Sequence, residues 1–339
     1  MKCLITGASG FLGKWVLQLL VDDPKIDVVH AVSRKKVTHP HPKVRVHQAD
    51  LTSPWNFMSE IGPIDSVIHL AGLYQFNQPL HLNYQSNVLA TVHLMDTFTG
   101  LEKSQRPQIY FASTYAVGLG SPGALQEKPL DRIPPVTEGY SHTKALAERA
   151  LTDSPLSTRV FRLGVLVGDS QQGAFEKSDG PYFVMKALGQ FKASRISRLS
   201  RKFPIPIPLQ KKGIMPLVPV DKAAEVFHRA LFLKPLAPKK SEFYGVFHSK
   251  SIELEALTRN IFDHCAPRCK PIFLPPKIHP SLLKAQSYFT GIPQEIFDYV
   301  LRPISLENPR FEATFGPGSI PHFNDFREAF FRGGKGLHS

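Results

Sequence analysis

Cysteine is scarce in this chain, which has three Cys among 339 residues. An odd and small number of thiols argues against a disulfide scaffold. Cys3 lies in the first expected strand, where a small hydrophobic residue packs well. His264, Cys265 and Cys269 lie close together, but their spacing matches no standard zinc pattern. The sequence therefore predicts no metal site.

Long apolar runs are also missing. The longest, such as residues 111–117 and 163–167, are far shorter than the roughly 20 residues of a transmembrane helix. A signal peptide is not expected, because Lys2 is followed within a few residues by Thr6 to Gly10, which interrupts any apolar segment. These absences predict a cytoplasmic chain with no transmembrane segment.

Acidic residues are few, since 28 Asp and Glu stand against 41 Lys and Arg, a net charge of +13. The excess favours anionic partners such as nucleotide phosphates, coenzyme A, an acidic carrier protein or lipid headgroups. Between Gly180 and Val220 there is no acid but eight basic residues: Lys186, Lys192, Arg195, Arg198, Arg201, Lys202, Lys211 and Lys212. An ordinary solvated helix face explains this basic stretch equally well. No nucleic-acid partner is expected, because no zinc-finger, RNP or helix-turn-helix signature is present.

The composition allows a large core, with 42% hydrophobic and 20% charged residues, and the first half alternates strand and helix patterns. Apolar strands are expected at 3–5, 28–32, 44–46, 66–70, 109–112 and 159–165, and helices at 12–20, 83–98 and 141–151. Such alternation predicts an α/β fold of the Rossmann type, a doubly wound parallel sheet with right-handed crossovers.

The alternation is lost after Gly168, where prolines accumulate, and one further helix is expected at 222–233. We therefore expect a dinucleotide-binding domain over 1–170, to which 214–250 return. A smaller substrate-binding subdomain is expected over 171–213 and 251–332, followed by a flexible tail over 333–339. The aromatic-rich second half is expected to line an apolar pocket.

A glycine motif occupies the turn between the first strand and the first helix, over residues 6–13 (Thr-Gly-Ala-Ser-Gly-Phe-Leu-Gly). Gly7 permits a tight turn, Gly10 lets a pyrophosphate come close, and Gly13 lets the helix pack near the strand. Free amides at the helix N-terminus then face the phosphates. The predicted cofactor contacts here are Gly7, Ser9, Gly10, Phe11, Leu12 and Gly13.

The end of the second strand discriminates between nicotinamide cofactors. An acidic residue there would bond the ribose hydroxyl of NAD, but the chain has Ser33-Arg34-Lys35-Lys36. Arg34 can pair with a 2′-phosphate and stack on adenine, so Ser33 and Arg34 predict NADP.

Two further strand ends complete the expected cofactor site. Asp50 and Leu51 follow the third strand, where a carboxylate can accept from the adenine amino group. The fourth strand ends in His69 and then Leu70-Ala71-Gly72, where the middle of the cofactor should lie. His69 is taken as a structural histidine.

A tyrosine and a lysine lie four residues apart at the start of a helix, so Tyr140 and Lys144 point to one side. A free tyrosine has a pKa near ~10, and a nearby ammonium lowers that pKa by favouring the phenolate. The same lysine can hold the nicotinamide ribose. Ser113 and Thr114, at the end of the fifth strand, are two candidates for the hydroxyl that holds a substrate oxygen.

In this order and spacing, the motifs of the first half resemble those of an extended short-chain dehydrogenase/reductase. Within that family, residues 111–118, 168–170 and 218–221 resemble segments of fatty acyl and thioester reductases. The resemblance implies the following roles: Thr114 orients the carbonyl, Tyr140 transfers the proton, Lys144 tunes Tyr140, Asn87 supports a water or backbone link near Lys144, and Leu163 and Val165 lie beside the nicotinamide carboxamide. Leu163 stands where many members have proline. A homodimer through two sheet-flanking helices is also implied.

These features predict an NADP(H)-dependent oxidoreductase that reduces a small-molecule carbonyl: an acyl thioester linked to coenzyme A or a carrier, a fatty aldehyde or a lipid-like ketone. One alternative is a sugar-nucleotide epimerase or dehydratase, which shares the fold and the tyrosine. Arg34 disfavours the NAD that such enzymes often prefer, and Tyr115 occupies the position where a dehydratase needs an acid. Another alternative is an NADP-sensing binding protein without turnover, which usually has a damaged Tyr or Lys.

Overall fold

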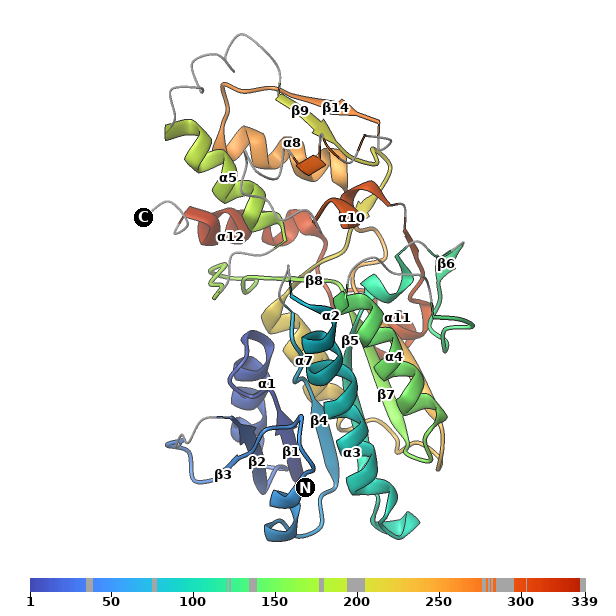
Figure 1. Cartoon of the computed structure of the whole chain (residues 1–339). Helices are drawn as coiled ribbons and strands as arrows, with labels where there is room; N and C mark the ends of the chain where they lie inside the picture. The colour runs from blue at the N-terminus through green and yellow to red at the C-terminus, as the bar shows by residue number, and fades with distance from the viewer. Residues whose placement is uncertain are drawn as a thin grey trace.

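The computed structural model describes residues 1–34, 39–74, 78–119, 121, 123–133, 139–176, 180–193, 205–275, 279, 281, 283–284, 296–302 and 304–335. Two lobes are evident (Figure 1). The lower lobe holds a large sheet with helices on both faces. The upper lobe is built on α5 (Pro181–Ala193), α8 (Leu254–Cys265) and α12 (Phe323–Lys335).

The central sheet has seven parallel strands in the order β12-β7-β5-β4-β1-β2-β3. Their bounds are β1 Lys2–Thr6, β2 Val28–Ser33, β3 Val44–Gln48, β4 Ser66–His69, β5 Gln108–Thr114, β7 Thr158–Leu163 and β12 Ser241–Val246. This arrangement confirms the predicted Rossmann-type sheet. The strand order reverses direction at β1, so the crevice at the carboxyl ends of β1 and β4 is where a ligand is expected.

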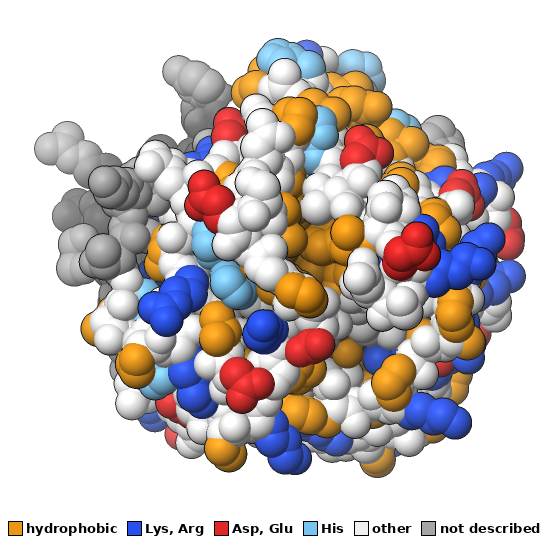
Figure 2. All heavy atoms as spheres, turned by 90° about the horizontal axis from the view of Figure 1, so that it is seen from below, with side chains coloured by type: hydrophobic (Ala, Val, Ile, Leu, Met, Phe, Trp, Pro, Cys, Tyr) orange, Lys and Arg blue, Asp and Glu red, His pale blue; other side chains and the backbone are white. Residues whose placement is uncertain are grey.

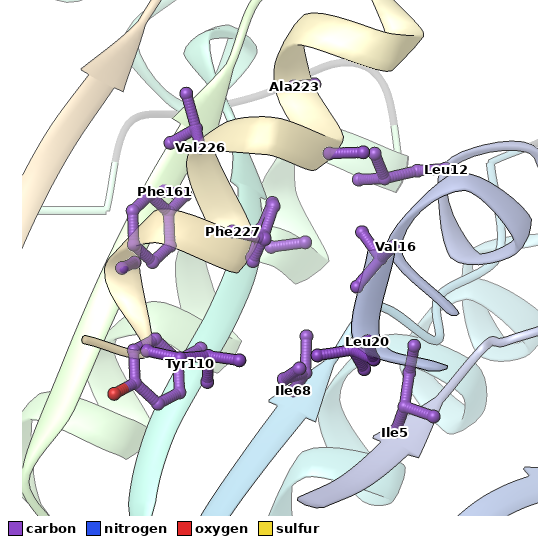
Figure 3. Packing of buried hydrophobic residues seen from close by; sticks show 14 of the residues in the cluster. Ile5, Leu12, Val16, Leu20, Ile68, Tyr110, Phe161, Ala223, Val226 and Phe227 are labelled. Carbon is purple, nitrogen blue, oxygen red and sulfur yellow. The ribbon is translucent and has the colours of Figure 1, made fainter. Parts of the chain in front are cut away.

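Side chains alternate between the two faces of the sheet. Ile5 and Phe161 pack with α1 (Phe11–Asp22) and α7 (Val220–Ala230), while Leu4 and Val160 pack with α3 (Ala90–Thr99) and α4 (Gly139–Asp153). Figure 3 shows Leu12, Val16 and Leu20 of α1 facing Phe227 of α7 above the strands. Each such buried side chain contributes about 1.5–3 kcal/mol, which holds α1 firmly against the sheet.

The helix expected at 83–98 is interrupted. It consists of α2 (Leu80–Asn83), a π-helical turn at Tyr84–Leu89 and then α3. The π turn places Asn87, whose Oδ1 accepts from Leu73 N at 2.8 Å and whose Nδ2 donates to Leu73 O at 3.3 Å. Side-chain bonds of this kind cannot be inferred from hydrophobic periodicity, and π turns are common at functional sites.

The upper lobe has its own core, which corrects one expectation. Phe323, Phe326, Phe330 and Phe331 of α12 are buried with Phe262 of α8 and fill this core rather than lining a pocket. Two small sheets cover the lobe, β9 (Ile205–Pro208) with β14 (Pro271–Leu274) and β10 (Ile214–Met215) with β13 (Ile252–Glu253). Phe289, another aromatic residue of the second half, lies outside the described residues.

The expected tail also differs, because α12 continues to Lys335 and residues 333–335 are helical. The two glycines permit close packing: a Cβ on Gly333 would lie 2.0 Å from Gly173 O, and one on Gly334 would lie 2.0 Å from Met185 Cε. Residues 336–339 lie outside the described ranges.

Several short elements join the lobes. β8 (Val165–Val167) pairs in parallel with β11 (Leu217–Pro219), and β6 (Ala124–Leu125) with β15 (Ser305–Leu306). Beyond β8, Ser170 donates from its N and Oγ to the Asp221 carboxylate at 2.8 and 2.6 Å. The remaining elements are α10 Ile296–Leu301, α11 Pro309–Phe315 and short helical turns at Asn56–Glu60, Lys103–Gln105 and Tyr115–Gly118. Within the ranges given above, no helix has the length and apolar composition needed to span a membrane.

Candidate active site

The turn between β1 and α1 has the form that a dinucleotide phosphate requires. Gly7 has φ +72°, and a Cβ there would lie 2.8 Å from Ala71 N. A Cβ on Gly13 would lie 2.0 Å from Gly7 O, so only glycine lets α1 pack this close to the strand. Gly10 precedes α1 with no side-chain cap, and the first turn has no acid. The amides at this N-terminus therefore suit an anionic pyrophosphate.

A cavity of about 430 Å³ runs from this turn to the upper lobe. It is lined by most of the predicted site residues: Gly7, Ser9, Gly10, Phe11, Leu12, Gly13, Leu70, Gly72, Thr114, Tyr140, Leu163 and Val165, together with Ser113. These come from the turns that follow β1 and β4 and from α1, β5, α4, β7 and β8, so the fold brings distant parts of the chain to one place. Its volume is within the range of small-molecule sites.

Other predicted residues do not line this cavity. Ala71 is partly buried, and Asn87 and Lys144 are buried. A Cβ on the cavity-lining Gly72 would lie 3.0 Å from Asn87 Oδ1 and 3.6 Å from Lys144 Nζ, so both polar groups lie directly behind the cavity wall.

Ser33, Arg34, Asp50 and Leu51 lie at the carboxyl ends of β2 and β3, outside the cavity lining. Arg34 is exposed, and Asp50 Oδ1 accepts from Thr52 N at 3.0 Å and Thr52 Oγ1 at 2.8 Å. These bonds and the charge of Arg34 lower the pKa of Asp50. Lys35 and Lys36 lie outside the described residues.

The two adjacent hydroxyls at the end of β5 have different partners. Ser113 Oγ donates to Glu148 Oε1 at 2.5 Å in the buried interior. Thr114 Oγ1 instead accepts from Ala116 N at 3.2 Å, so its own hydrogen stays available to another acceptor. Both residues line the cavity, but this geometry favours Thr114 as the donor to a ligand.

Lys144 is held in a dry environment. Its Nζ lies 4.3 Å from the centre of the Phe111 ring, and the residue is 3% exposed. Burial lowers the pKa of Lys144 to about 8, and the Glu148 carboxylate opposes this change. Tyr140, one helical turn earlier, lines the cavity, and the Tyr74 ring meets its ring edge-on with centroids 4.8 Å apart.

His69 is buried in a chain of hydrogen bonds. Its Nδ1 lies 2.7 Å from Thr6 Oγ1, which accepts from Ala71 N, and its Nε2 lies 3.4 Å from Thr91 Oγ1. Since Thr91 donates its own hydrogen to Asn87 O at 2.7 Å, Nε2 must donate to Thr91 and Nδ1 must accept from Thr6. Burial lowers the pKa of His69 to about 3, so the ring is neutral and structural.

The upper wall contains residues that the sequence did not single out. They are Tyr74, Gly180, Pro181, Val184, Met215, Leu254, Leu257, Thr258, Ile261 and Val300. Tyr299, one of the aromatic residues of the second half, lines this wall as the sequence led us to expect. On α8, Leu254, Leu257, Thr258 and Ile261 recur at helical spacing and form one stripe, a signal that also fits plain core packing. This end of the cavity is predominantly apolar.

A second cavity of about 530 Å³ lies at the opposite, amino-terminal edge of the sheet, beside Ser66, Gln108 and Leu233. None of the predicted site residues line it. Figure 2 shows this lower face, where hydrophobic side chains lie in a hollow near the centre and Lys and Arg are mixed with Asp and Glu around it. The net positive charge is therefore not gathered on this face.

Two sequence features remain separate from the cavity. In the basic stretch, Lys186, Lys211 and Lys212 are exposed, while residues 194–204 lie outside the described ranges. His264 stacks on Phe331 with centroids 4.5 Å apart, and Cys265 is buried. Across the described ranges, no three His, Cys, Asp or Glu side chains are grouped as a metal site would require.

Known proteins resemble this chain in sequence. Residues 42–227, more than half of the chain, match the family described as Male sterility protein. The chain is 29% identical over 240 residues to the hybrid PKS-NRPS synthetase xenE of Xenoacremonium sinensis. This alignment covers 65% of this chain and 6% of that protein. It is 32% identical over 163 residues to the polyketide synthase-nonribosomal peptide synthetase phmA of Phaeosphaeria nodorum, covering 43% of this chain and 4% of that one. The chain thus spans only a small part of these relatives.

Solved structures share the fold. The terminal R domain from the myxalamid PKS-NRPS biosynthetic pathway has a TM-score of 0.74 at 18% identity, over 97% of this chain and 89% of that one. UDP-glucuronic acid 4-epimerase from Bacillus cereus, in complex with NAD, has a TM-score of 0.69 at 15% identity over the full length of both chains. The family match and this shared fold confirm the predicted resemblance. The chain belongs to the Male sterility protein family, among the extended short-chain dehydrogenases/reductases.

Proposed function

We propose that this protein is an NADP(H)-dependent reductase that reduces the carbonyl of an acyl thioester carried by coenzyme A or an acidic carrier protein. The observation that carries the proposal is that one continuous cavity joins the glycine turn, the Thr114 and Tyr140 side chains and an apolar upper end. A phosphate cradle, a proton donor and an acyl-sized apolar space are thus continuous.

The cofactor part of the proposal depends on the glycine turn and on Arg34. When bound, NADPH supplies the hydride. The amides at the start of α1 hold the pyrophosphate, and Arg34 at the end of β2 pairs with the 2′-phosphate. Leu163 and Val165 also line the cavity, and we expect them to lie beside the nicotinamide.

The protein groups act on the carbonyl oxygen. Thr114 donates a hydrogen bond that orients the carbonyl, and Tyr140 delivers a proton to the oxygen as the carbon receives hydride. The ammonium of Lys144, one turn along α4, stabilises the negatively charged tyrosinate that remains after the proton transfer. The product, a hemithioacetal, expels the thiol and leaves an aldehyde, which a second round converts to an alcohol.

The acyl part of the proposal rests on the upper wall. Val184, Leu257 and Ile261 face the cavity, which suits a hydrocarbon better than a sugar. Resemblance to a terminal R domain of a PKS-NRPS pathway supports a carrier-bound substrate. The exposed Lys186, Lys211 and Lys212 of the basic stretch would attract the phosphopantetheine or its acidic carrier.

The test is NADPH oxidation against a panel of acyl-CoA thioesters, acyl carriers, fatty aldehydes, lipid-like ketones and UDP-sugars. We expect turnover with acyl thioesters that is lost in Tyr140→Phe. Preference for NADPH over NADH should fall about 10- to 100-fold in Arg34→Ala, because a charge-assisted hydrogen bond is lost. Conversion of a UDP-sugar without net NADPH oxidation would instead establish an epimerase. NADPH binding without turnover of any panel member would favour the sensing role.

A further inference from the structure

A buried carboxylate, Glu148 of α4, joins the elements that carry the proposed catalytic residues. Its Oε1 accepts from Ser113 Oγ of β5 at 2.5 Å and from Arg162 Nε of β7 at 3.0 Å. Its Oε2 accepts from Arg162 Nη2 at 2.7 Å. Both charged side chains are 2% exposed, so water does not share this bidentate pair.

Each partner of Glu148 is next to a residue of the active site. Ser113 immediately precedes Thr114, and Arg162 immediately precedes Leu163. Glu148 itself follows Lys144 by four residues on the same face of α4. A single carboxylate therefore fixes β5, β7 and α4 relative to one another at the level of the reacting groups.

The charges around Lys144 give Glu148 a second role. From β4, the neutral His69 faces Lys144, and from β5 the Phe111 ring does. Arg162 on β7 holds Glu148 in place, and Glu148 raises the pKa that burial lowers. Without this negative charge, the buried ammonium would lose its proton more readily.

We propose that Glu148 is a positioning residue for the reaction: through Ser113 and Arg162 it sets Thr114 and Leu163 relative to Tyr140, and it supplies the counter-charge for Lys144. The proposal rests on the proposed reductase function. A purely structural ion pair offers the contrast. Arg159, near the amino end of the same strand as Arg162, donates from Nε to Glu242 Oε2 of β12 at 3.3 Å, and neither residue lines the cavity.

The first test compares Glu148→Gln with Glu242→Gln as the matched control. Since activity needs Lys144 charged, the rate of reduction should fall as pH rises through the pKa of Lys144, about 8 in the unaltered protein. In Glu148→Gln this fall should move to lower pH by about one unit. Glu242→Gln should lower the melting temperature but leave the pH profile unchanged.

A second variant keeps the test decisive if Glu148→Gln folds poorly, which is a risk because Arg162 would be left buried without a counter-charge. Ser113→Ala removes one hydrogen bond to Glu148 and leaves the ion pair intact. It should lower kcat about 10-fold with little change in KM, because the position of Thr114 changes. The melting temperature should fall less than in Glu148→Gln, because Arg162 keeps its counter-charge.

The charge on Lys144 can also be measured without turnover. NMR titration of lysine-labelled protein, with the Lys144 signal assigned from a Lys144→Arg variant, should give a lower pKa in Glu148→Gln than in the unaltered chain. If the unaltered protein does not reduce any acyl thioester, the proposed reductase function itself is refuted. Three results together would overturn the role of Glu148 and leave the reductase function intact. They are normal turnover with an unshifted pH profile in Glu148→Gln, an unshifted Lys144 titration in the same variant, and full activity in Ser113→Ala.

Discussion

At the residue scale, the neighbouring hydroxyls of Ser113 and Thr114 at the end of β5 have different hydrogen-bond partners and therefore different roles. Ser113 gives its hydrogen to Glu148 and holds the scaffold, whereas Thr114 keeps its hydrogen at the cavity. The sequence alone left these two residues as alternatives, because both have the same chemistry. The hydrogen bond from Ser113 to Glu148 of α4, which only the folded chain forms, distinguishes them.

The Thr114→Val variant should therefore lose activity much more than stability. Removal of a hydrogen bond to the developing negative oxygen costs about 10²- to 10³-fold in kcat, while loss of the cap on Ala116 N costs about 1 kcal/mol. Steady-state kinetics and thermal melting would measure both effects. Thr114→Ser, which retains the hydroxyl, is the control, and a Thr114→Val enzyme with normal kcat would remove Thr114 from the mechanism.

His69 should make the protein sensitive to acid. Its folded-state pKa is lowered to about 3, whereas an unfolded histidine titrates near ~6.5. Between these values the unfolded chain binds a proton that the folded chain excludes. The free energy of unfolding should therefore fall as pH decreases through this window, by about 1.4 kcal/mol per pH unit.

The His69→Asn variant tests this linkage, because the Asn Oδ1 can still accept from Thr6 while the titrating group is gone. Denaturant unfolding from pH 7 to pH 4 should show a shallower loss of stability than in the unaltered chain. His93→Gln on α3 is the control. Equal acid sensitivity in His69→Asn would mean that other groups dominate.

At the element scale, the position of α1 depends on the absence of a side chain at Gly13. In Gly13→Ala the new Cβ would lie 2.0 Å from Gly7 O, so the start of α1 must move away from β1. We expect NADPH to bind about 100-fold more weakly, because the amides that face the phosphates move with the helix.

Fluorescence titration of NADPH binding measures this effect. Gly62→Ala is the matched control, since nothing lies within 4 Å of a Cβ there, and it should bind NADPH normally. Equal affinities in both glycine variants would show that the phosphates bind elsewhere.

The elements of the first half were predictable because their signals are local. Each strand and helix from β1 to β5 is a short apolar or periodic segment bounded by turn residues, and the predicted spans agree with the structure to within a few residues. The π turn at Tyr84–Leu89 was not predictable, because hydrophobic periodicity does not distinguish it from an α-helix, and Asn87 within it bonds Leu73, 14 residues away. The edge strand β12 likewise joins the sheet only through pairing with β7.

At the scale of the whole molecule, residues of both lobes line the cavity. The lower lobe contributes the glycine turn and the hydroxyls, whose motifs are contiguous in sequence and were identified from it. The upper wall combines α5, α8 and Tyr299, which are far apart in the chain, and no local pattern brings them together. The aromatic residues of the second half were expected in the pocket, yet the four phenylalanines of α12 fill the core of the upper lobe.

The lobe arrangement predicts that the upper wall sets acyl chain length. In Thr258→Phe a larger side chain would fill the apolar end of the cavity, so KM for long-chain acyl thioesters should rise at least about 10-fold while short-chain substrates are unaffected. Arg259→Phe, one residue along on the exposed side of α8, is the control. Uniform loss for all chain lengths would place the acyl group elsewhere.

The central claim is that hydride passes directly from NADPH to a carbonyl carbon in this cavity, with Tyr140 as the proton donor. The most direct measurement uses NADPH deuterated at the transferable position and an acyl thioester, with mass spectrometry of the product. We predict deuterium on the carbon of the former carbonyl in the aldehyde or alcohol, and none when Tyr140→Phe replaces the unaltered protein. Product that forms without deuterium, or equal labelling with Tyr140→Phe, would contradict the proposed mechanism.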